Sequence, residues 1–245
     1  MLLIDAGNSR IKWALIVGGA WSRQGVVENG QAETLRLAFN NLPPPKKILA
    51  SNVAGEEMGK RLHAICALWP SPVEFIAART EQCGVRNLYQ NPAQLGSDRW
   101  AALIAAWQQE HTSCLVVNCG TATTLDTLSQ QGEFLGGLIL PGIHMMQRSL
   151  VTGAAALGHE MVQGSWSKFP RNTADAMTSG AILATVAAIR FQFEALAGYG
   201  EPRCLISGGA AVSILPYLDM PLLRMDNLVL RGLQIIGEQG TEARA

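Results

Sequence analysis

The sequence predicts an α/β protein made of two similar domains, each a mixed β-sheet flanked by helices. The chain has 245 residues, 48% hydrophobic and 16% charged, which is enough apolar material for a substantial core. Strand-like and helix-like stretches alternate along it, as in α/β folds. Each half also opens with strand-like runs around a similar glycine turn, "LLIDAGNSRIKWAL" at 2–15 and "LVVNCGTATTLD" at 115–126.

The first half begins with three strand-like runs, rich in branched and aromatic residues: "MLLID", "IKWALIV" and roughly "WSRQGVVE". After them the pattern predicts a helix around "AETLRLAFNN", a strand "KKILASNV", a helix "EEMGKRLHAICALW" and a strand near "VEFIA". A long helix is predicted to begin near Ser97 with "SDRWAALIAAWQQ". The predicted order is therefore β-β-β-α-β-α-β-α.

The second half repeats the opening, with strands predicted at "CLVVN", "ATTLDTL" and "EFLGGLIL". Helices follow at about 143–151 and across "NTADAMTSGAILATVAAIRFQFEALA". A strand "RCLISG" leads into the small-residue turn "GGAA", and a last helix covers about "LRGLQIIGEQG". We place the boundary near residues 110–113, which predicts one domain at 1–111 and a second at 112–245.

Charge and cysteine usage narrow the class of protein. The formal net charge is zero, which argues against nucleic acid as the main partner, because nucleic-acid binders usually carry a basic excess. The five cysteines are odd in number and have no C-x-x-C spacing, which indicates free thiols in a reducing compartment rather than disulfides or a zinc site. We see no signal peptide and no apolar run of ~18 residues, so we expect no membrane contact and a cytoplasmic location.

The two glycine turns have the features of a phosphate site. Gly7 and Gly120 allow the backbone to turn tightly and to approach a ligand closely. The backbone N–H groups that follow, with the side chains of Asn8, Ser9 and Thr121, are suited to form a nest of donors for an anion.

Charged residues next to the first turn extend this interpretation. Lys12 supplies a point charge for a phosphate, and Asp5 at the strand end is a candidate ligand for Mg²⁺, directly or through water. A single Gly-Asn turn is also an ordinary hairpin signal, but two turns at corresponding places favour phosphate binding. The stretch "SGGAA" at 207–211 suits either a nucleoside packed on the backbone or a close contact between helix and strand.

Six stretches together resemble the type III pantothenate kinases, a family of the acetate and sugar kinase/Hsp70/actin superfamily. They span nearly the whole chain: "DAGNSRIK" (5–12), "GVRNLYQNPAQLGSDRW" (84–100), "GTATTLD" (120–126), "GGLILPG" (136–142), "NTADAMTSG" (172–180) and "SGGAA" (207–211). Within the superfamily, G-x-D-R-W with an upstream Tyr and the two glycine turns is specific to this family.

This resemblance implies two ribonuclease H-like (actin-like ATPase) domains with the active site in the cleft between them. It implies ATP-dependent phosphorylation of pantothenate to 4'-phosphopantothenate, the first step of coenzyme A synthesis, with Mg²⁺ accompanying ATP. It also implies a homodimer in which the neighbouring subunit completes the pantothenate pocket.

The resemblance further implies roles for individual residues. The expected ATP-binding residues are Asp5, Ala6, Gly7, Asn8, Ser9, Arg10, Ile11, Lys12 and Thr121. The expected pantothenate-binding residues are Tyr89, Gly96, Ser97, Asp98, Arg99 and Thr173, with Asp98 also the catalytic proton acceptor.

The chemistry of these residue types fits a kinase independently. Asp98 is suited to accept the proton of an attacking hydroxyl, and the planar fork of Arg99 is suited to a carboxylate or a phosphate. Tyr89 offers a hydroxyl and an apolar face to a small polar acid. Each residue also has a simpler explanation: Asp98 and Thr173 stand where helix N-caps belong, and Arg99 suits an ordinary surface ion pair.

Asn118 departs from the family pattern, because many members have Asp there as a ligand of the monovalent cation, K⁺ or NH₄⁺, that they require. Asn keeps a carbonyl oxygen but lacks the charge that holds a weakly bound cation. Two interpretations remain open: the site is degenerate and the cation bound weakly or not needed, or Asn118 only hydrogen-bonds its own turn. We expect a weakened or absent cation requirement.

Two other functions compete with pantothenate phosphorylation. The first is a regulatory accessory protein of the same fold without kinase activity. The second is a kinase of the same superfamily that acts on a sugar or another small acid. The stretch "GSDRW" together with Tyr89 favours pantothenate.

Overall fold

The computed structural model describes residues 1–153 and 163–242, and the chain forms two compact units. Unit 1 comprises residues 1–109 together with the C-terminal segment from residue 227, and unit 2 comprises residues 110–226. The first domain was predicted to end at residue 111, and the first segment of unit 1 ends two residues earlier, at 109. The second domain was predicted to run from 112 to 245, but its last helix belongs to unit 1.

Two glycines of the last helix, α6 (Leu228–Glu242), explain this grouping. A Cβ atom at Gly232 would overlap the backbone of Ala101, and one at Gly237 would lie 2.9 Å from Leu49 Cδ1. The helix therefore packs closely on unit 1 where a larger side chain would not fit, which its own sequence pattern does not reveal.

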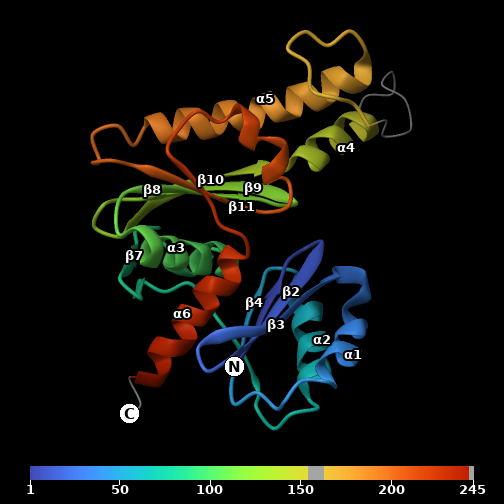
Figure 1. Cartoon of the computed structure of the whole chain (residues 1–245), viewed down its shortest axis with the longest axis vertical. Helices are drawn as coiled ribbons and strands as arrows, with labels where there is room; N and C mark the ends of the chain where they lie inside the picture. The colour runs from blue at the N-terminus through green and yellow to red at the C-terminus, as the bar shows by residue number, and fades with distance from the viewer. Residues whose placement is uncertain (154–162, 243–245) are drawn as a thin grey trace. The chain divides into compact units, whose positions relative to one another are not determined.

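Unit 1 contains a five-stranded sheet in the order β3-β2-β1-β4-β5, in which β1, β2 and β3 are antiparallel and β4 and β5 continue parallel to β1. The strands of this sheet are β1 (Leu2–Ala6), β2 (Arg10–Val17), β3 (Ala20–Glu28), β4 (Ile48–Asn52) and β5 (Val73–Phe75). The residues of unit 1 also include two short strands outside this sheet, β6 (Glu81–Gln82) and β7 (Val85–Asn87). Its helices are α1 (Leu35–Phe39), α2 (Glu56–Cys66), α3 (Ser97–Glu110) and α6 (Figure 1).

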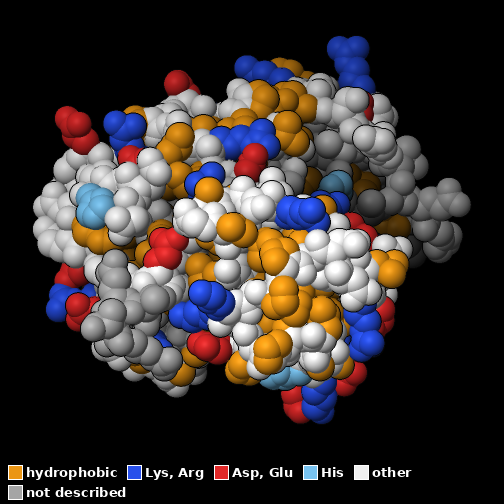
Figure 2. Space-filling view, turned by 60° about the horizontal axis from the view of Figure 1, so that its bottom comes forward, with side chains coloured by type: hydrophobic (Ala, Val, Ile, Leu, Met, Phe, Trp, Pro, Cys, Tyr) orange, Lys and Arg blue, Asp and Glu red, His pale blue; other side chains and the backbone are white. Residues whose placement is uncertain are grey.

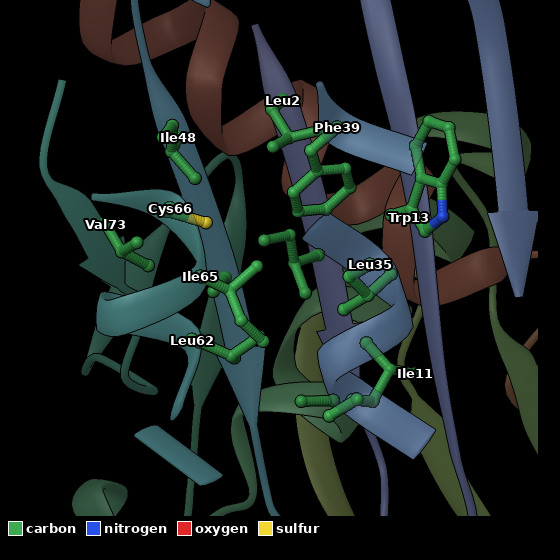
Figure 3. Packing of buried hydrophobic residues seen from close by; sticks show 14 of the residues in the cluster. Leu2, Ile11, Trp13, Leu35, Phe39, Ile48, Leu62, Ile65, Cys66 and Val73 are labelled. Atoms are coloured by element: carbon green, nitrogen blue, oxygen red, sulfur yellow. The ribbon is translucent and has the colours of Figure 1, made fainter. Parts of the chain in front are cut away.

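The core of unit 1 follows from the alternation of side chains along β1. Leu2 and Ile4 point to the face covered by α1 and α2, where they join a fully buried cluster (Figure 3). In that cluster the rings of Trp13 and Phe39 meet edge to face at 5.4 Å between centroids. The side chains in between, including Asp5, belong to the opposite face.

Unit 2 repeats this topology. Its antiparallel strands β8 (Cys114–Cys119), β9 (Ala122–Leu128) and β10 (Glu133–Pro141) form the predicted meander, and β11 (Arg203–Ser207) and β12 (Leu222–Arg224) continue parallel to β8. Figure 1 shows α4 (Ile143–Gly153) and α5 (Thr173–Glu194) along one face of this sheet. The repeated opening predicted from the two glycine turns is confirmed.

Short elements account for the differences from the sequence prediction. The strands β6, β7 and β12 have two or three residues each, too few to show a period of two. The helix predicted around residues 32–41 is instead a 3₁₀ segment at Asn29–Thr34 followed by the five residues of α1. Gln31 interrupts the 3₁₀ segment with non-helical angles of φ −113° and ψ 24°.

We expected no apolar run long enough to span a membrane, but helix α5 meets that criterion. Among the described residues, this helix is long and apolar enough to cross a bilayer by length and composition alone. Of its 18-residue apolar stretch, 33% is buried. The core helix of a soluble protein meets the same criterion, and the side chain of Gln192 on α5 donates a hydrogen bond to Thr127 Oγ1 at 3.1 Å. The length criterion is therefore weak evidence for a membrane segment.

Surface charges are mixed in sign. On the face that Figure 2 shows, Lys and Arg side chains lie among Asp and Glu side chains, and hydrophobic side chains reach the surface between them. This agrees with the formal net charge of zero.

Candidate active site

The first glycine turn joins β1 to β2, and it is held by backbone contacts. Gly7 N donates to Arg10 O at 3.0 Å, which closes the turn. Asn29, at the end of β3, donates through Nδ2 to Gly7 O at 2.9 Å and through its backbone N to Ser9 O at 2.8 Å. The side chains of Asn8, Ser9 and Arg10 are exposed, so the predicted donors face solvent on a turn of defined shape.

Asn29 is a residue that the sequence analysis missed. It stands 22 residues from the carbonyl that it binds, and its own neighbourhood, "ENGQ", looks like an ordinary turn. No local pattern connects it to the phosphate-type turn.

Asp5 and Lys12 stand opposite each other on the antiparallel strands β1 and β2. Both are half-buried. Burial raises the pKa of Asp5 to about 7, the Lys12 ammonium opposes this rise, and the carboxylate of Asp98 adds to it. Two predicted site residues, Asp5 and Asp98, are therefore close enough within unit 1 to repel each other, although 93 positions separate them in the sequence.

Asp98 occupies the first turn of α3, and its carboxylate folds back along the helix start. Its Oδ1 accepts a hydrogen bond from Arg99 N at 2.8 Å. A Cβ atom on Gly96 would lie 2.6 Å from that same Oδ1, so a side chain at position 96 would displace the Asp98 carboxylate. Burial raises the pKa of Asp98, while the Arg99 amide and charge oppose the rise.

These contacts bear on the two explanations of Asp98. The carboxylate accepts the backbone N–H of Arg99 in the first turn, but Asp98 is the second residue of α3 and does not occupy the N-cap position that the simpler explanation expected. The carboxylate of Asp98 also lies near that of Asp5, and burial raises the pKa of both groups. Two buried carboxylates with raised pKa values are typical of a functional site.

Arg99 and Tyr89 are brought together by the fold. Arg99 Nη1 donates to Tyr89 Oη at 3.3 Å, and its guanidinium carbon lies 5.9 Å from the centre of the tyrosine ring. Arg99 is 7% exposed, which contradicts the explanation that it is an ordinary surface ion pair. The buried side chain of Asn87 also accepts from Tyr89 N at 3.1 Å and thereby orients the tyrosine.

The second glycine turn, in unit 2, is enclosed by two other glycines. Gly142 N donates to Thr121 O at 3.0 Å, and a Cβ atom at Gly142 would overlap the carbonyl oxygens of Gly120 and Thr121. Gly208, with φ of +99°, approaches the backbone of Cys119 so closely that a Cβ atom there would overlap it. The "SGGAA" stretch therefore makes a close backbone contact in the structure.

Asn118 is the last but one residue of β8 and lies just before this turn. It is half-buried and stands in register with Thr124 of β9 and Ser207 of β11. Among the described residues there is no group of three or more His, Cys, Asp or Glu side chains placed to hold a metal ion.

Thr173 is the first residue of α5 and is exposed. The cap of this helix is Asn172, whose side chain accepts from Asp175 N at 2.9 Å and donates to Asp175 Oδ2 at 2.7 Å. The stretch "NTAD" does begin a helix, as the simpler explanation expected, but Asn172 and not Thr173 caps it.

Comparisons with known proteins point to one family. The sequence model of the type III pantothenate kinases matches residues 1–195. The type III pantothenate kinase of Nitrosospira multiformis is 46% identical over 244 residues, which cover 99% of this chain and 92% of that protein. The type III pantothenate kinase of Aromatoleum aromaticum is 43% identical over 243 residues, covering 99% of this chain and 100% of that protein.

Solved structures with lower identity show the fold. A putative Baf family transcriptional activator from Campylobacter jejuni superposes with a TM-score of 0.65 at 23% identity, covering 98% of this chain and 100% of that one. The AMPPNP-bound MreB 5 of Spiroplasma citri superposes with a TM-score of 0.52 at 11% identity, covering 99% and 97%. The predicted fold class, with two sheets flanked by helices as in actin-like ATPases, is confirmed.

Proposed function

The chain belongs to the type III pantothenate kinase family, and we propose on this premise that it transfers the γ-phosphoryl group of ATP to the primary hydroxyl of pantothenate. The product is 4'-phosphopantothenate, and the reaction is the first step of coenzyme A synthesis. One observation carries the proposal for this chain's own residues: Asp5 from β1, Lys12 from β2 and Asp98 from α3 lie close enough to shift the pKa of Asp5.

Asp98 is the proposed proton acceptor. The pantothenate hydroxyl oxygen attacks the γ-phosphorus, its proton passes to the Asp98 carboxylate, and the bond between the γ-phosphorus and the bridging oxygen breaks to release ADP. The raised pKa of Asp98 makes it a better base than an exposed aspartate, while the contact with Arg99 N fixes the carboxylate at the start of α3.

The proposed phosphate site is the turn at residues 5–12, with Thr121 of unit 2 as a further donor. Lys12 adds a positive charge, and the Gly7–Ser9 backbone is shaped by Asn29. The carboxylate of Asp5 suits a hard cation, because proximity to Asp98 and burial both disfavour its bare charge. Mg²⁺ bound with ATP would neutralise charge on the phosphates, and Asp5 would hold it directly or through water.

The proposed pantothenate site uses Tyr89, Gly96, Ser97, Arg99 and Thr173. The buried, tyrosine-bound guanidinium of Arg99 is held in place before any substrate arrives, which suits it to pair with the carboxylate of pantothenate or with a phosphate. Exposure of Thr173, which the helix does not need as its cap, supports a contact with substrate.

For the monovalent cation we propose a weak or absent requirement. Asn118 offers an amide oxygen at the end of β8, where many family members have a carboxylate. Without that negative charge, K⁺ or NH₄⁺ loses much of its attraction to the site.

We also propose a homodimer in the cytoplasm. Unit 2 exposes several large apolar side chains on β10, α4 and α5, and exposed apolar side chains of this size are common at subunit interfaces. They are Leu138 (43% exposed), Ile139 (65%), Met145 (44%), Leu150 (42%), Leu183 (57%) and Phe191 (73%). All five cysteines are free thiols, which supports a reducing compartment.

The direct test is formation of phosphopantothenate from pantothenate and Mg-ATP, with Na⁺ or K⁺ as the sole monovalent cation. Product with either cation supports both the kinase and the weak cation requirement. Product with K⁺ alone supports the kinase and refutes our proposal for Asn118. The absence of product in both would refute the kinase proposal and favour a regulatory protein or another acceptor.

The dimer is tested by light scattering of the purified chain. Replacing Leu183 and Phe191 by Ser should convert a dimer into monomers, because both side chains are exposed on α5. A monomeric unmodified protein would contradict this part of the proposal.

A further inference from the structure

We propose that Ser51 is a positioning residue for the phosphoryl transfer: its buried hydroxyl holds the start of α3, and with it Asp98, beside the strand end that carries Asp5. The inference rests on the proposed function. It concerns a residue that lies in none of the sequence stretches that indicated the family.

The first observation is the register of two neighbouring strands. Strands β1 and β4 are parallel, and Ser51 stands next to Asp5 in the ladder. Side chains in register on parallel strands point to the same face of the sheet. Ile4 and Ala50 belong to the cluster on the α1–α2 side, so Asp5 and Ser51 belong to the other face, at the carboxyl ends of their strands.

The second observation is a contact between hydroxyl groups. Ser51 Oγ lies 2.9 Å from Ser97 Oγ, and either hydroxyl is a possible donor. Ser97 is the first residue of α3 and immediately precedes Asp98. This hydrogen bond therefore connects the strand beside Asp5 directly to the turn that carries Asp98.

The third observation is that the anchor is buried and rigid. Ser51 is 0% exposed, so its side chain cannot reach a substrate in solvent. Directly after it the chain is tied by Asn52, whose Oδ1 accepts from Ala54 N at 3.0 Å and whose Nδ2 donates to Gly55 O at 2.9 Å. A hydroxyl on so constrained a segment is a fixed point against which α3 can be placed.

These observations predict an effect on kcat rather than on KM. Asp98 accepts a proton during the chemical step, and a displacement of about 1 Å at a reacting group can lower a rate about 100-fold. Ser51 itself would touch neither ATP nor pantothenate. A loss of kcat with unchanged KM is the signature of an interaction needed in the transition state alone.

The experiment compares Ser51→Ala with the unmodified enzyme and with Ser113→Ala. Ser113 is a matched control, because it too is 0% exposed and its hydroxyl donates a hydrogen bond to Tyr199 O at 2.6 Å. Both residues of that bond belong to unit 2, whereas Ser51 and Ser97 belong to unit 1. We expect Ser51→Ala to lower kcat by about tenfold or more with the KM for ATP within about twofold. Ser113→Ala should lose thermal stability to a similar extent while keeping kcat.

A double-mutant cycle tests whether Ser51 acts through Ser97. If it does, adding Ser51→Ala to Ser97→Ala should lower kcat little further, because the hydrogen bond is already gone. Ser51→Cys, which keeps nearly the same volume but donates weakly, should show the same loss of kcat and serves if the alanine variant does not fold.

The failures are distinguishable. Absence of product from the unmodified chain would overturn the proposed function, and this inference with it. If the unmodified enzyme forms product, two results would overturn this inference without affecting the proposed function. The first is a kcat of Ser51→Ala within twofold of the unmodified value, and the second is that the losses of kcat from Ser51→Ala and Ser97→Ala multiply independently.

Discussion

Replacing Asp5 by Asn should stabilise the free protein, and more so at pH 8 than at pH 5. Burial and the nearby Asp98 raise the pKa of Asp5 from 3.8 to about 7 in the folded protein, against the opposing effect of Lys12. Between these two values the folded protein retains a proton that the unfolded chain has lost. Stability therefore falls as the pH rises through this window, and the loss is complete above about pH 7.

The size of the effect follows from the same two values. Proton linkage between a pKa of 3.8 and one of about 7 gives a loss of at most about 3 kcal/mol between pH 5 and pH 8. Asp5 is only half-buried, and water at its exposed side reduces the penalty. We expect the stabilisation by Asp5→Asn to be larger at pH 8 than at pH 5 by about 1–2 kcal/mol, or about 2–8 °C in Tm.

The assay is thermal or urea unfolding of both proteins at the two pH values without nucleotide or Mg²⁺. Asp219→Asn is the control, since Asp219 is exposed and its replacement should change stability equally at both pH values. If the unmodified protein and Asp5→Asn showed the same difference between pH 5 and pH 8, the carboxylate of Asp5 would not be held in the unfavourable environment that the structure indicates.

Three further predictions concern activity. Asp98→Asn should lower kcat by about 10²-fold or more with an unchanged far-ultraviolet circular dichroism spectrum, because general-base catalysis contributes about 10²–10⁴-fold; near-normal turnover would refute the role of Asp98 as base. Gly96→Ala should lower kcat at least tenfold, about the effect of a sub-ångström displacement, because its Cβ would lie 2.6 Å from Asp98 Oδ1. The control Gly180→Ala has no neighbouring atom within 4 Å of its Cβ and should have normal kinetics. Equal kinetics of the two variants would contradict this prediction. Asn118→Asp should increase the ratio of rates measured in K⁺ and Na⁺, because it restores a carboxylate; a strong K⁺ dependence of the unmodified enzyme would refute our proposal that the site is weak.

Long elements with a clear period could be predicted from the sequence, and short ones could not. The strands and turns around Gly7 and Gly120 were found because alternation and glycine placement are local properties. The helix predicted around residues 32–41 is α-helical only over the five residues of α1, and a 3₁₀ segment that Gln31 interrupts precedes it. Strand β6 has two residues, and its Gln82 accepts a hydrogen bond from Trp100 Nε1 at 2.9 Å, a partner 18 positions away.

Some features of the candidate site could likewise be predicted from the sequence, and others could not. Asp5 and Lys12 are paired by a hairpin whose turn is visible in the sequence, so their proximity was predictable. For Asp98 the residue pattern left open a helix cap or a base, and both explanations depend on the surroundings of the carboxylate. Burial and the influence of Asp98 on Asp5 favour the functional explanation, and these are properties of the folded chain.

By itself, the sequence determined the fold class, the repeated turn and the family, because periodicity, glycine positions and motif spacing are written along the chain. Tertiary structure alone decided that Ser51 reaches Ser97, that Asn29 shapes the first turn and that α6 belongs with unit 1. Each of these contacts joins residues at least 22 positions apart, with Ser51 and Ser97 separated by 46. Chain folding sets such distances through the packing of whole elements, and no local pattern of residues encodes them.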